Sequence, residues 1–143
     1  MTNPARLRHL MLHVSDVALS LDFYVEVLGG LARSWVEPCS SEAASSPLQS
    51  PPQAAAVMLD GISILLLPKG GHARQFGDQP LGLGIYPVVE VPDLDLFHQR
   101  CVDLGRWDAV SGPAVDQPWG WRELAVRDPD GYVWTVIETP KDS

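Results

Sequence analysis

The chain has 143 residues, a formal net charge of −8 and 45% hydrophobic residues, which is the size and composition of one globular domain. The acidic excess argues against a nucleic-acid partner, because binding to nucleic acid requires clustered lysine and arginine. No apolar run is long enough to span a bilayer and no secretory signal is evident, so the sequence predicts a cytoplasmic protein without a membrane partner.

The first half of the chain predicts a strand, a helix and three further strands. Residues 7–14 are mostly apolar and predict a strand, and Ser15-Asp16 is a typical N-cap pair for the helix that follows. Gly29-Gly30 ends that helix. The remaining predicted strands cover residues 31–37, 54–59 and 62–67. The segment 38–53 is rich in Ser, Ala and Pro and predicts a mobile loop.

The second half repeats this order after a Gly-rich, polar linker at residues 69–84. Asp93 is the expected N-cap of a second helix, which Gly105 ends. The predicted strands cover residues 85–91, 107–115 (with a break at 111–113), 121–127 and 132–137. The last two strands flank Asp128-Pro129-Asp130-Gly131, in which Pro and Gly favour a tight turn.

The two halves match each other at specific positions. Val14-Ser15-Asp16 corresponds to Val91-Pro92-Asp93, and Asp60-Gly61 corresponds to Asp130-Gly131. A unit of this size repeated once predicts an α+β fold of two tandem βαβββ modules that form a curved mixed sheet around a cleft. The predicted modules cover about residues 5–68 and 85–140 of a single domain, 1–143.

These segments carry a resemblance to a known family. The opening motif at residues 9–16 (HLMLHVSD), the segment 23–29 (FYVEVLG) and the closing motif at 127–131 (RDPDG) resemble the vicinal oxygen chelate superfamily. That superfamily includes glyoxalase I, extradiol dioxygenases and bleomycin-resistance proteins. The closing block, at residues 111–113 (SGP), 117–120 (QPWG), 122–123 (RE) and 127–131 (RDPDG), is most similar to the bleomycin-resistance branch, which implies a homodimer with ligand clefts between its subunits.

The resemblance also implies four places where the enzymes of the superfamily hold a divalent metal. The corresponding residues are His9, Leu67 or Pro68, Tyr86 and Glu138. Only His9 and Glu138 are common ligands, and such ions want three or more, so the expectation is no cofactor, with a divalent metal as the alternative. His13 and Glu123 are expected on the wrong faces of their strands to complete the site. The ordinary roles are a hydrogen-bonded core histidine for His9 and a solvated carboxylate for Glu138.

Aromatic residues make the stronger case for a binding site. The chain has five tryptophans, and Trp119 and Trp121 flank Gly120 in a predicted turn where a large ring is hard to bury. Such rings can stack on planar or cationic ligands. The predicted ligand-binding residues are Phe23, Trp35, Tyr86, Trp119 and Trp121. The same rings could instead pack a dimer interface, where aromatic residues are enriched.

Three functions follow from these observations. The first is a protein of the bleomycin-resistance type that binds a small planar or cationic molecule without a metal and without chemistry. The second is a metal-dependent lyase of the glyoxalase type or an extradiol-type dioxygenase, in which a metal held by His9 and Glu138 acts as a Lewis acid on two substrate oxygens. The third is an inert subunit or immunity partner of another chain.

Overall fold

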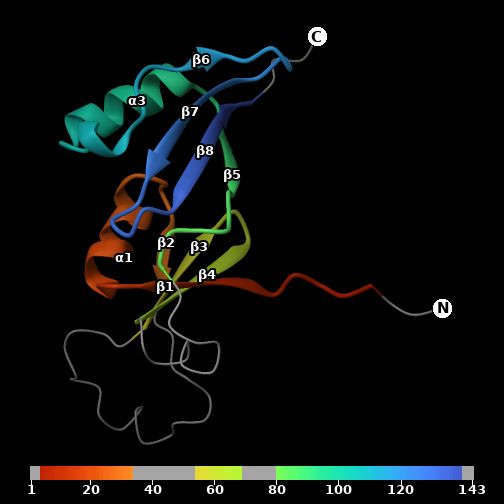
Figure 1. The fold of residues 1–143 in the computed structure, drawn as a ribbon, viewed down its shortest axis with the longest axis vertical. Coiled ribbons are helices and arrows are strands. Elements are labelled where there is room, and N and C mark those ends of the chain that lie inside the picture. Colours follow the sequence, from red (N-terminus) through yellow and green to blue (C-terminus); the bar gives the residue numbers. More distant parts are fainter. Residues whose placement is uncertain (1–3, 34–53, 69–79, 140–143) are drawn as a thin grey trace, which may run out of the picture. The chain divides into compact units, whose positions relative to one another are not determined.

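The computed structural model describes residues 4–33, 54–68 and 80–139. These residues fall into two compact units, which are residues 1–79 (unit 1) and residues 80–143 (unit 2) (Figure 1). The predicted loop at 38–53 and the 69–79 part of the predicted linker lie outside the described residues. The assignment of both modules to one domain stays a prediction, and each unit is described by itself.

Unit 1 is a four-stranded mixed sheet with one helix. Its elements are β1 (His9–Val14), α1 (Val17–Glu26), β2 (Leu31–Arg33), β3 (Ala55–Leu59) and β4 (Ile62–Pro68). The strand order is β1-β4-β3-β2. The first and last strands of the unit, β1 and β4, are parallel, and the other neighbours are antiparallel.

Unit 2 repeats this plan. Its elements are β5 (Val88–Val91), α3 (Leu94–Asp103), the short 3-10 helix η2 (Trp107–Ala109), β6 (Val115–Asp116), β7 (Arg122–Arg127) and β8 (Val133–Glu138). The strand order is β5-β8-β7-β6, and β5 is again parallel to the last strand. Each unit is therefore a βαβββ module, which confirms the predicted α+β fold and its internal repeat.

One predicted strand is wrong. Residues 107–115 were expected to form a strand with a break at 111–113, but Trp107–Ala109 is a 3-10 helix and Val110 makes only an isolated bridge to Val126. Gly112 has a φ of 132°, and Pro113 has no N–H to donate to a neighbouring strand. Pairing resumes only in the two residues of β6. The predicted strand at 85–91 is also shorter and begins at Val88.

Both helices start at the predicted caps. The Asp16 carboxylate accepts a hydrogen bond from the backbone N–H of Leu19 at 3.0 Å, and Asp93 accepts one from Leu96 at 3.1 Å. Each aspartate has extended backbone angles, as an N-cap residue should. Among the described residues, neither helix is long and apolar enough to cross a membrane.

Each sheet has one face covered by its helix, and strand alternation assigns residues to the two faces. In unit 1, Leu12 and Leu66 are buried on the α1 side together with Phe23 and Tyr24. In unit 2, the side chains of β7 and β8 that pack toward α3 are Leu124, Val126, Trp134 and Val136. The opposite face of each sheet is called its helix-free face below.

The N-cap of α1 gives a test of this local architecture. We expect Asp16→Ala to lower the free energy of unfolding by about 1 kcal/mol, because the first-turn N–H of Leu19 loses its acceptor. Urea denaturation would measure the change. Asp22→Ala removes an exposed carboxylate from the middle of the same helix and should change the free energy by no more than about 0.5 kcal/mol. Equal losses in both variants would contradict the capping role.

Candidate functional site

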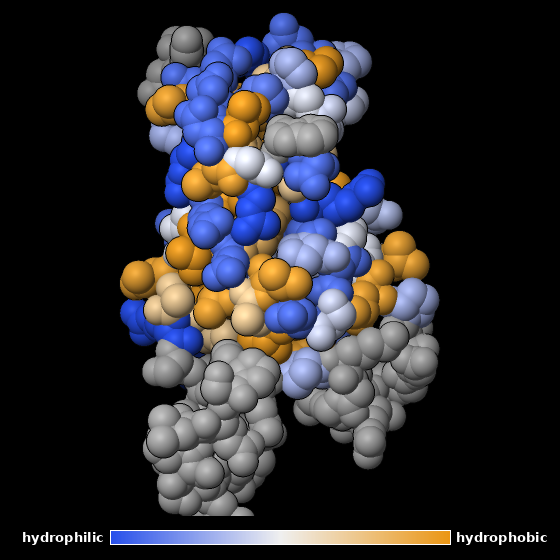
Figure 2. Space-filling view, turned by 90° about the vertical axis from the view of Figure 1, so that its left-hand side faces the viewer, coloured by the Kyte–Doolittle hydropathy of each residue, from blue (hydrophilic) through white to orange (hydrophobic). Residues whose placement is uncertain are grey.

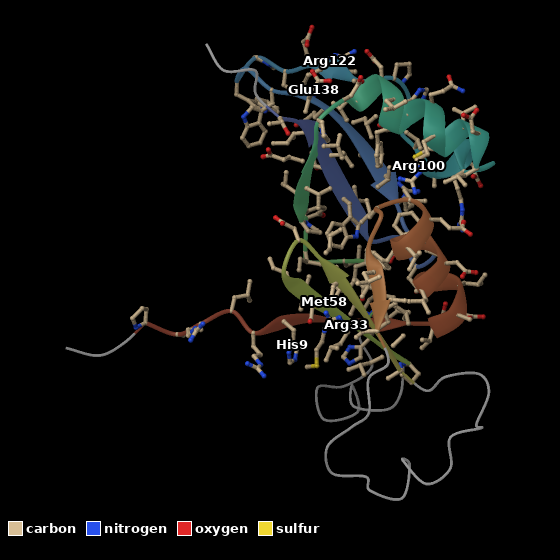
Figure 3. The ribbon with its side chains drawn as sticks, turned by 180° about the vertical axis from the view of Figure 1, so that it is seen from behind. His9, Arg33, Met58, Arg100, Arg122 and Glu138 are labelled. Atoms are coloured by element: carbon tan, nitrogen blue, oxygen red, sulfur yellow. The ribbon has the colours of Figure 1, made fainter. Side chains whose placement is uncertain are left out.

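The Glu138 carboxylate lies at the start of helix α3. Its Oε2 atom accepts a hydrogen bond from the backbone N–H of Leu94 at 3.0 Å, and it lies 3.3 Å from Nη1 of Arg122 (Figure 3). The side chain is only 19% exposed. Leu94 is the first residue of α3, where free N–H groups and the helix dipole both favour an anion. Glu138 therefore stabilises the helix start, on the side of the sheet that α3 covers.

Arg122 links this carboxylate to a second one. Its Nη2 atom is 2.8 Å from Oδ1 of Asp95, in the first turn of α3. The hydrogen bond from Arg122 holds the pKa of Asp95 below its usual 3.8. The same hydrogen bond raises the pKa of Arg122. Two carboxylates and one guanidinium therefore tie β7, β8 and the N-terminus of α3 together.

The four places implied for a divalent metal do not supply a fitting set of ligands. Glu138 already accepts two donors on the helix side of its sheet. Tyr86 is 73% exposed, whereas Leu67 is buried and, like Pro68, has no side-chain donor atom for a metal. In the described parts of the chain, no three His, Cys, Asp or Glu side chains come together in a way that could hold an ion. The joint role of His9 and Glu138 as metal ligands stays a prediction.

The two histidines of β1 lie on the same face of their strand. Leu12 and Val14 are buried toward α1, so His9, Met11 and His13 lie on the helix-free face of unit 1. The expectation that His13 points to the wrong face is therefore wrong, because residues four apart on a strand share a face.

Glu123, in contrast, lies where it was expected. It pairs with Ile137 in the register of β7 with β8, so its side chain faces away from the side of Glu138. This places Glu123 on the helix-free face of unit 2.

Two of the predicted aromatic residues are held out on an ordered turn. Trp119 is 62% exposed and Trp121 is 43% exposed, in the turn that joins β6 to β7. The backbone N–H of Gln117 donates to the Trp121 carbonyl at 2.7 Å, and that of Gly120 donates to the Gln117 carbonyl at 3.0 Å. The φ of Gly120 is 97°, a value that favours glycine between the two rings.

The other predicted aromatic residues are placed differently. Phe23 is 1% exposed, and its ring packs edge-to-face on Tyr24 with the ring centroids 5.1 Å apart. Its position indicates a core role in unit 1, and no ring face is open to a ligand there. Tyr86 is exposed in the segment before β5. Trp35 lies outside the described residues.

The helix-free face of unit 2 carries acidic side chains next to these rings. In the strand register, Ile137 lies between Glu90 on β5 and Glu123 on β7, so the three residues form one row across this face. Trp121 comes two residues before Glu123, and alternation places it on the same side. Sequence reasoning missed Glu90, although the alternation of Val89, Glu90 and Val91 was a usable signal.

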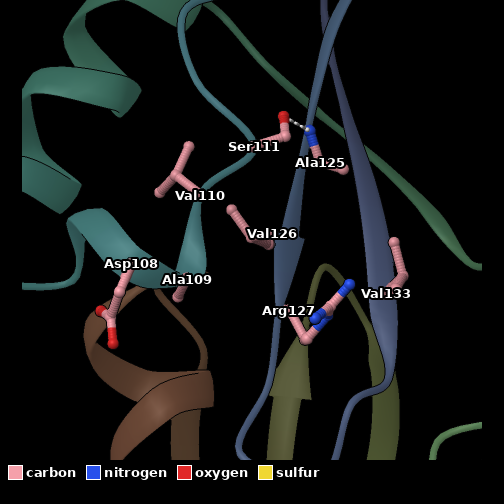
Figure 4. A pocket seen from close by; sticks show the side chains of 8 residues that line it. All are labelled: Asp108, Ala109, Val110, Ser111, Ala125, Val126, Arg127 and Val133. Atoms are coloured by element: carbon pink, nitrogen blue, oxygen red, sulfur yellow. Dashed lines mark hydrogen bonds between the residues drawn. The ribbon is translucent and has the colours of Figure 1, made fainter.

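A small pocket lies beside this face. Its volume is about 170 Å³, and its wall includes the Oγ atom of Ser111, which accepts a hydrogen bond from the Ala125 N–H at 3.0 Å (Figure 4). The lining residues are Asp108, Ala109, Val110, Ser111, Ala125, Val126, Arg127 and Val133. Pockets that enclose drug-sized ligands are larger, roughly 300–1,000 Å³. This pocket alone therefore suits a fragment of a ligand, not a whole one.

The surface of the described residues is mixed in polarity on one side of the molecule. Figure 2 shows hydrophobic side chains in separate patches between hydrophilic ones on the face in view. The exposed apolar residues of unit 2 are Leu83, Tyr86, Val88, Leu96, Val102, Leu104, Val115, Trp119 and Trp121. Acidic residues such as Glu90 lie among them in the sequence. Such a surface can combine apolar contact with charge.

Comparison with known proteins assigns the family. The model of the Glyoxalase/Bleomycin resistance protein/Dioxygenase superfamily matches residues 6–136, which is most of the chain. The chain belongs to this superfamily. The match confirms the resemblance at the level of the superfamily and spans both βαβββ modules.

Individual proteins are similar to this chain in sequence or in fold. An uncharacterized Mycobacterium bovis protein, Mb0911c, is 29% identical over 141 residues, which cover 93% of this chain and 82% of that protein. A solved structure from the mobile metagenome of V. pseudocholerae has a TM-score of 0.70 at 19% identity and covers 99% of both chains. A superfamily member from Sphaerobacter thermophilus has a TM-score of 0.65 at 23% identity, with 95% of this chain and 98% of that chain covered. At these identities the two structures show a shared fold.

The role of Glu138 at the start of α3 can be tested by its removal. We expect Glu138→Ala to lower the free energy of unfolding by about 1.5–3 kcal/mol, because Leu94 and Arg122 both lose a charged acceptor. Chemical denaturation in the presence of a chelator would measure this. Glu90→Ala removes an exposed carboxylate from the same sheet and should have little effect. An unchanged free energy of unfolding in Glu138→Ala would contradict this structural role and would favour a role of the Glu138 carboxylate as a metal ligand.

The Asp95–Arg122 pair predicts a pH dependence of stability. The folded-state pKa of Asp95 is lowered, so the stability from this pair is present above pH 3.8 and is lost as the pH falls through the lowered value. We expect the stability difference between the wild type and Asp95→Asn to shrink on acidification over this range and to shrink at high salt. Denaturation curves at several pH values would show it, with Asp22→Asn as a control that lacks the pair. A difference that stays constant with pH would contradict the prediction.

Proposed function

We propose that this chain binds a small, planar organic cation on the helix-free face of unit 2, without a metal and without chemical conversion of the ligand. The observation that carries the proposal is the pair of exposed tryptophans on an ordered turn. A rigid aromatic side chain offers a large contact area at a low cost in conformational entropy. Trp119 and Trp121 can therefore stack on a flat ligand without first having to be ordered.

Charge decides which flat ligand is favoured. Glu123 lies on the same face as Trp121, and Glu90 extends the acidic row across the sheet. A cation over a tryptophan face gains about 0.5–2 kcal/mol, and a neighbouring carboxylate adds attraction. The net charge of −8 also attracts cations at long range. An anionic ligand of the same shape would meet repulsion from each of these groups.

The absence of a fitting ligand set at the four implied positions favours binding over metal chemistry. Glu138 is engaged with α3, and the equivalent positions offer a phenol and apolar side chains. A binder that sequesters its ligand needs only a complementary surface. We accordingly place the chain nearest the bleomycin-resistance type within its superfamily, as a homodimer in the cytoplasm that holds a small molecule.

The proposal predicts a difference between a cationic and an anionic aromatic probe. We expect the planar cation proflavine to bind more tightly than the anion 1-anilinonaphthalene-8-sulfonate, as measured by isothermal titration calorimetry. Trp121→Ala should weaken proflavine binding by about 0.5–2 kcal/mol, or roughly 2–30-fold. Glu123→Gln should also weaken it, and added salt should reduce the preference for the cation.

Controls separate this site from general attraction and from a dimer contact. Asp22→Asn removes one exposed negative charge from α1 and should leave proflavine binding unchanged. Equal binding of both probes, or wild-type affinity in the Trp121 and Glu123 variants, would contradict the proposal. If Trp121→Ala dissociates a dimer in native mass spectrometry but leaves proflavine binding intact, the rings form a subunit contact instead.

A further inference from the structure

A row of three side chains crosses the helix-free face of unit 1. His9 on β1 and Met58 on β3 both pair with Ser63 on the intervening strand β4. Residues directly opposite each other in a sheet point to the same side. The imidazole and the thioether therefore stand on either side of a small hydroxyl group, on the face away from α1. Figure 3 labels His9 and Met58 in this part of unit 1.

A hydrogen bond fixes the position of the sulfur atom. The Ser63 hydroxyl donates to the Sδ atom of Met58 at 2.9 Å. The sulfur therefore lies over β4 and is turned toward β1, the strand that carries His9. A thioether sulfur has a second lone pair, which this hydrogen bond does not use. Ser63 thus holds a soft donor atom beside β4, the strand that separates Met58 from His9.

His9 is a suitable partner for the opposite side. It is half-buried, and within the described residues its imidazole makes no hydrogen bond or ion pair. The backbones of β1 and β3 lie about 9.6 Å apart, which is twice the spacing of neighbouring strands. A metal ion bound by both side chains would require them to lean inward over Ser63.

Met11 supplies a second thioether on the same strand as His9. It is the next residue of β1 on this face and is 42% exposed. Residues two apart on a strand are neighbours along one face, and the long, unbranched methionine side chain adapts to such a gap. The imidazole of His9 therefore shares this face with two thioethers, from Met11 and Met58, and His13 lies farther along the same strand.

We propose that the His9 imidazole and these two thioethers form a binding site for a soft monovalent metal ion of the Cu(I) or Ag(I) class. Thioether sulfur and imidazole nitrogen are ligands that select Cu(I), whereas hard divalent ions prefer oxygen. All three ligands are uncharged, and Arg33 adds a positive charge on the same face, at the far strand β2 (Figure 3). That charge balance disfavours a divalent ion more strongly than a monovalent one. The site uses neither Glu138 nor Tyr86.

Methyl resonances of methionine give a direct test in the intact protein. The chain has three methionines, so protein labelled with ¹³C at the methionine ε-methyl groups should show three signals. We expect one equivalent of Ag(I) to shift the signals of Met58 and Met11 and to leave Met1 unchanged. One equivalent of Zn²⁺ should leave the Met58 and Met11 signals in place. Individual Met→Leu variants would assign the signals.

Competition for Cu(I) against bicinchoninate measures the affinity. Met58→Leu and His9→Gln should each weaken Cu(I) binding by at least about tenfold. Removal of a residue that only supports a metal ligand already costs about that much affinity, and these variants remove a ligand itself. Leucine keeps the volume and apolar character of methionine, so the fold should persist. His98→Gln, on α3 of unit 2, is the matched control and should bind Cu(I) as the wild type does.

Three results would overturn the proposal. They are an Ag(I) shift of Met1 alone, the absence of any shift, and wild-type Cu(I) affinity in folded Met58→Leu protein. Circular dichroism of each variant would show that it is folded. Because the site shares no residue with the proposed cation surface of unit 2, proflavine binding by the same variants should be unchanged. Cu(I) binding and proflavine binding can therefore fail independently, so a failure of the metal site is distinguishable from a failure of the proposed cation surface.

Discussion

Within the described residues, each sheet packs the helix of its own unit against one face, and this constraint divides the side chains of every strand between a helix side and a helix-free side. On β7, Arg122, Leu124 and Val126 point toward α3, whereas Glu123 and Ala125 point away. Neighbouring residues of the strand therefore have different surroundings: one packs against the helix, and the next lies on the helix-free face. An acid on the helix side must find donors, since burial of an unpaired charge is costly. Glu138 meets this requirement with the Leu94 N–H and the Arg122 guanidinium.

The sequence was sufficient where the signal is local. Both N-caps act within three residues, and the strand–helix–strand order can be read from short windows. The repeat was visible because the same turn dipeptide recurs before the last strand of each module. Even the shared face of His9 and His13 follows from their spacing alone, so that error was one of reasoning and not of missing information.

The sequence was insufficient where partners are far apart in the chain. Glu138 lies 44 residues from Leu94 and 16 from Arg122, and no local pattern shows that the three meet. Its position at the end of an apolar strand was compatible with a ligand, a solvated acid or a helix cap. The pairing of His9 and Met58 with Ser63 likewise depends on strand order, because β4 inserts between β1 and β3. The prediction for residues 107–115 was wrong for another reason: the interruption at 111–113 was expected, but the short segment Trp107–Ala109 forms a 3-10 helix and not a strand.

The match between the modules has a consequence for how the two halves respond to heat. Glu138 pairs with Val91 at the end of β8, and the residue in the same place of unit 1 is Pro68, which pairs with Val14 at the end of β4. The side chain of proline has no acceptor atom, so Pro68 cannot give α1 the side-chain anchor that Glu138 gives to α3. The duplicated halves are therefore thermally unequal at this point, and the first turn of α1 is expected to fray at a lower temperature than that of α3.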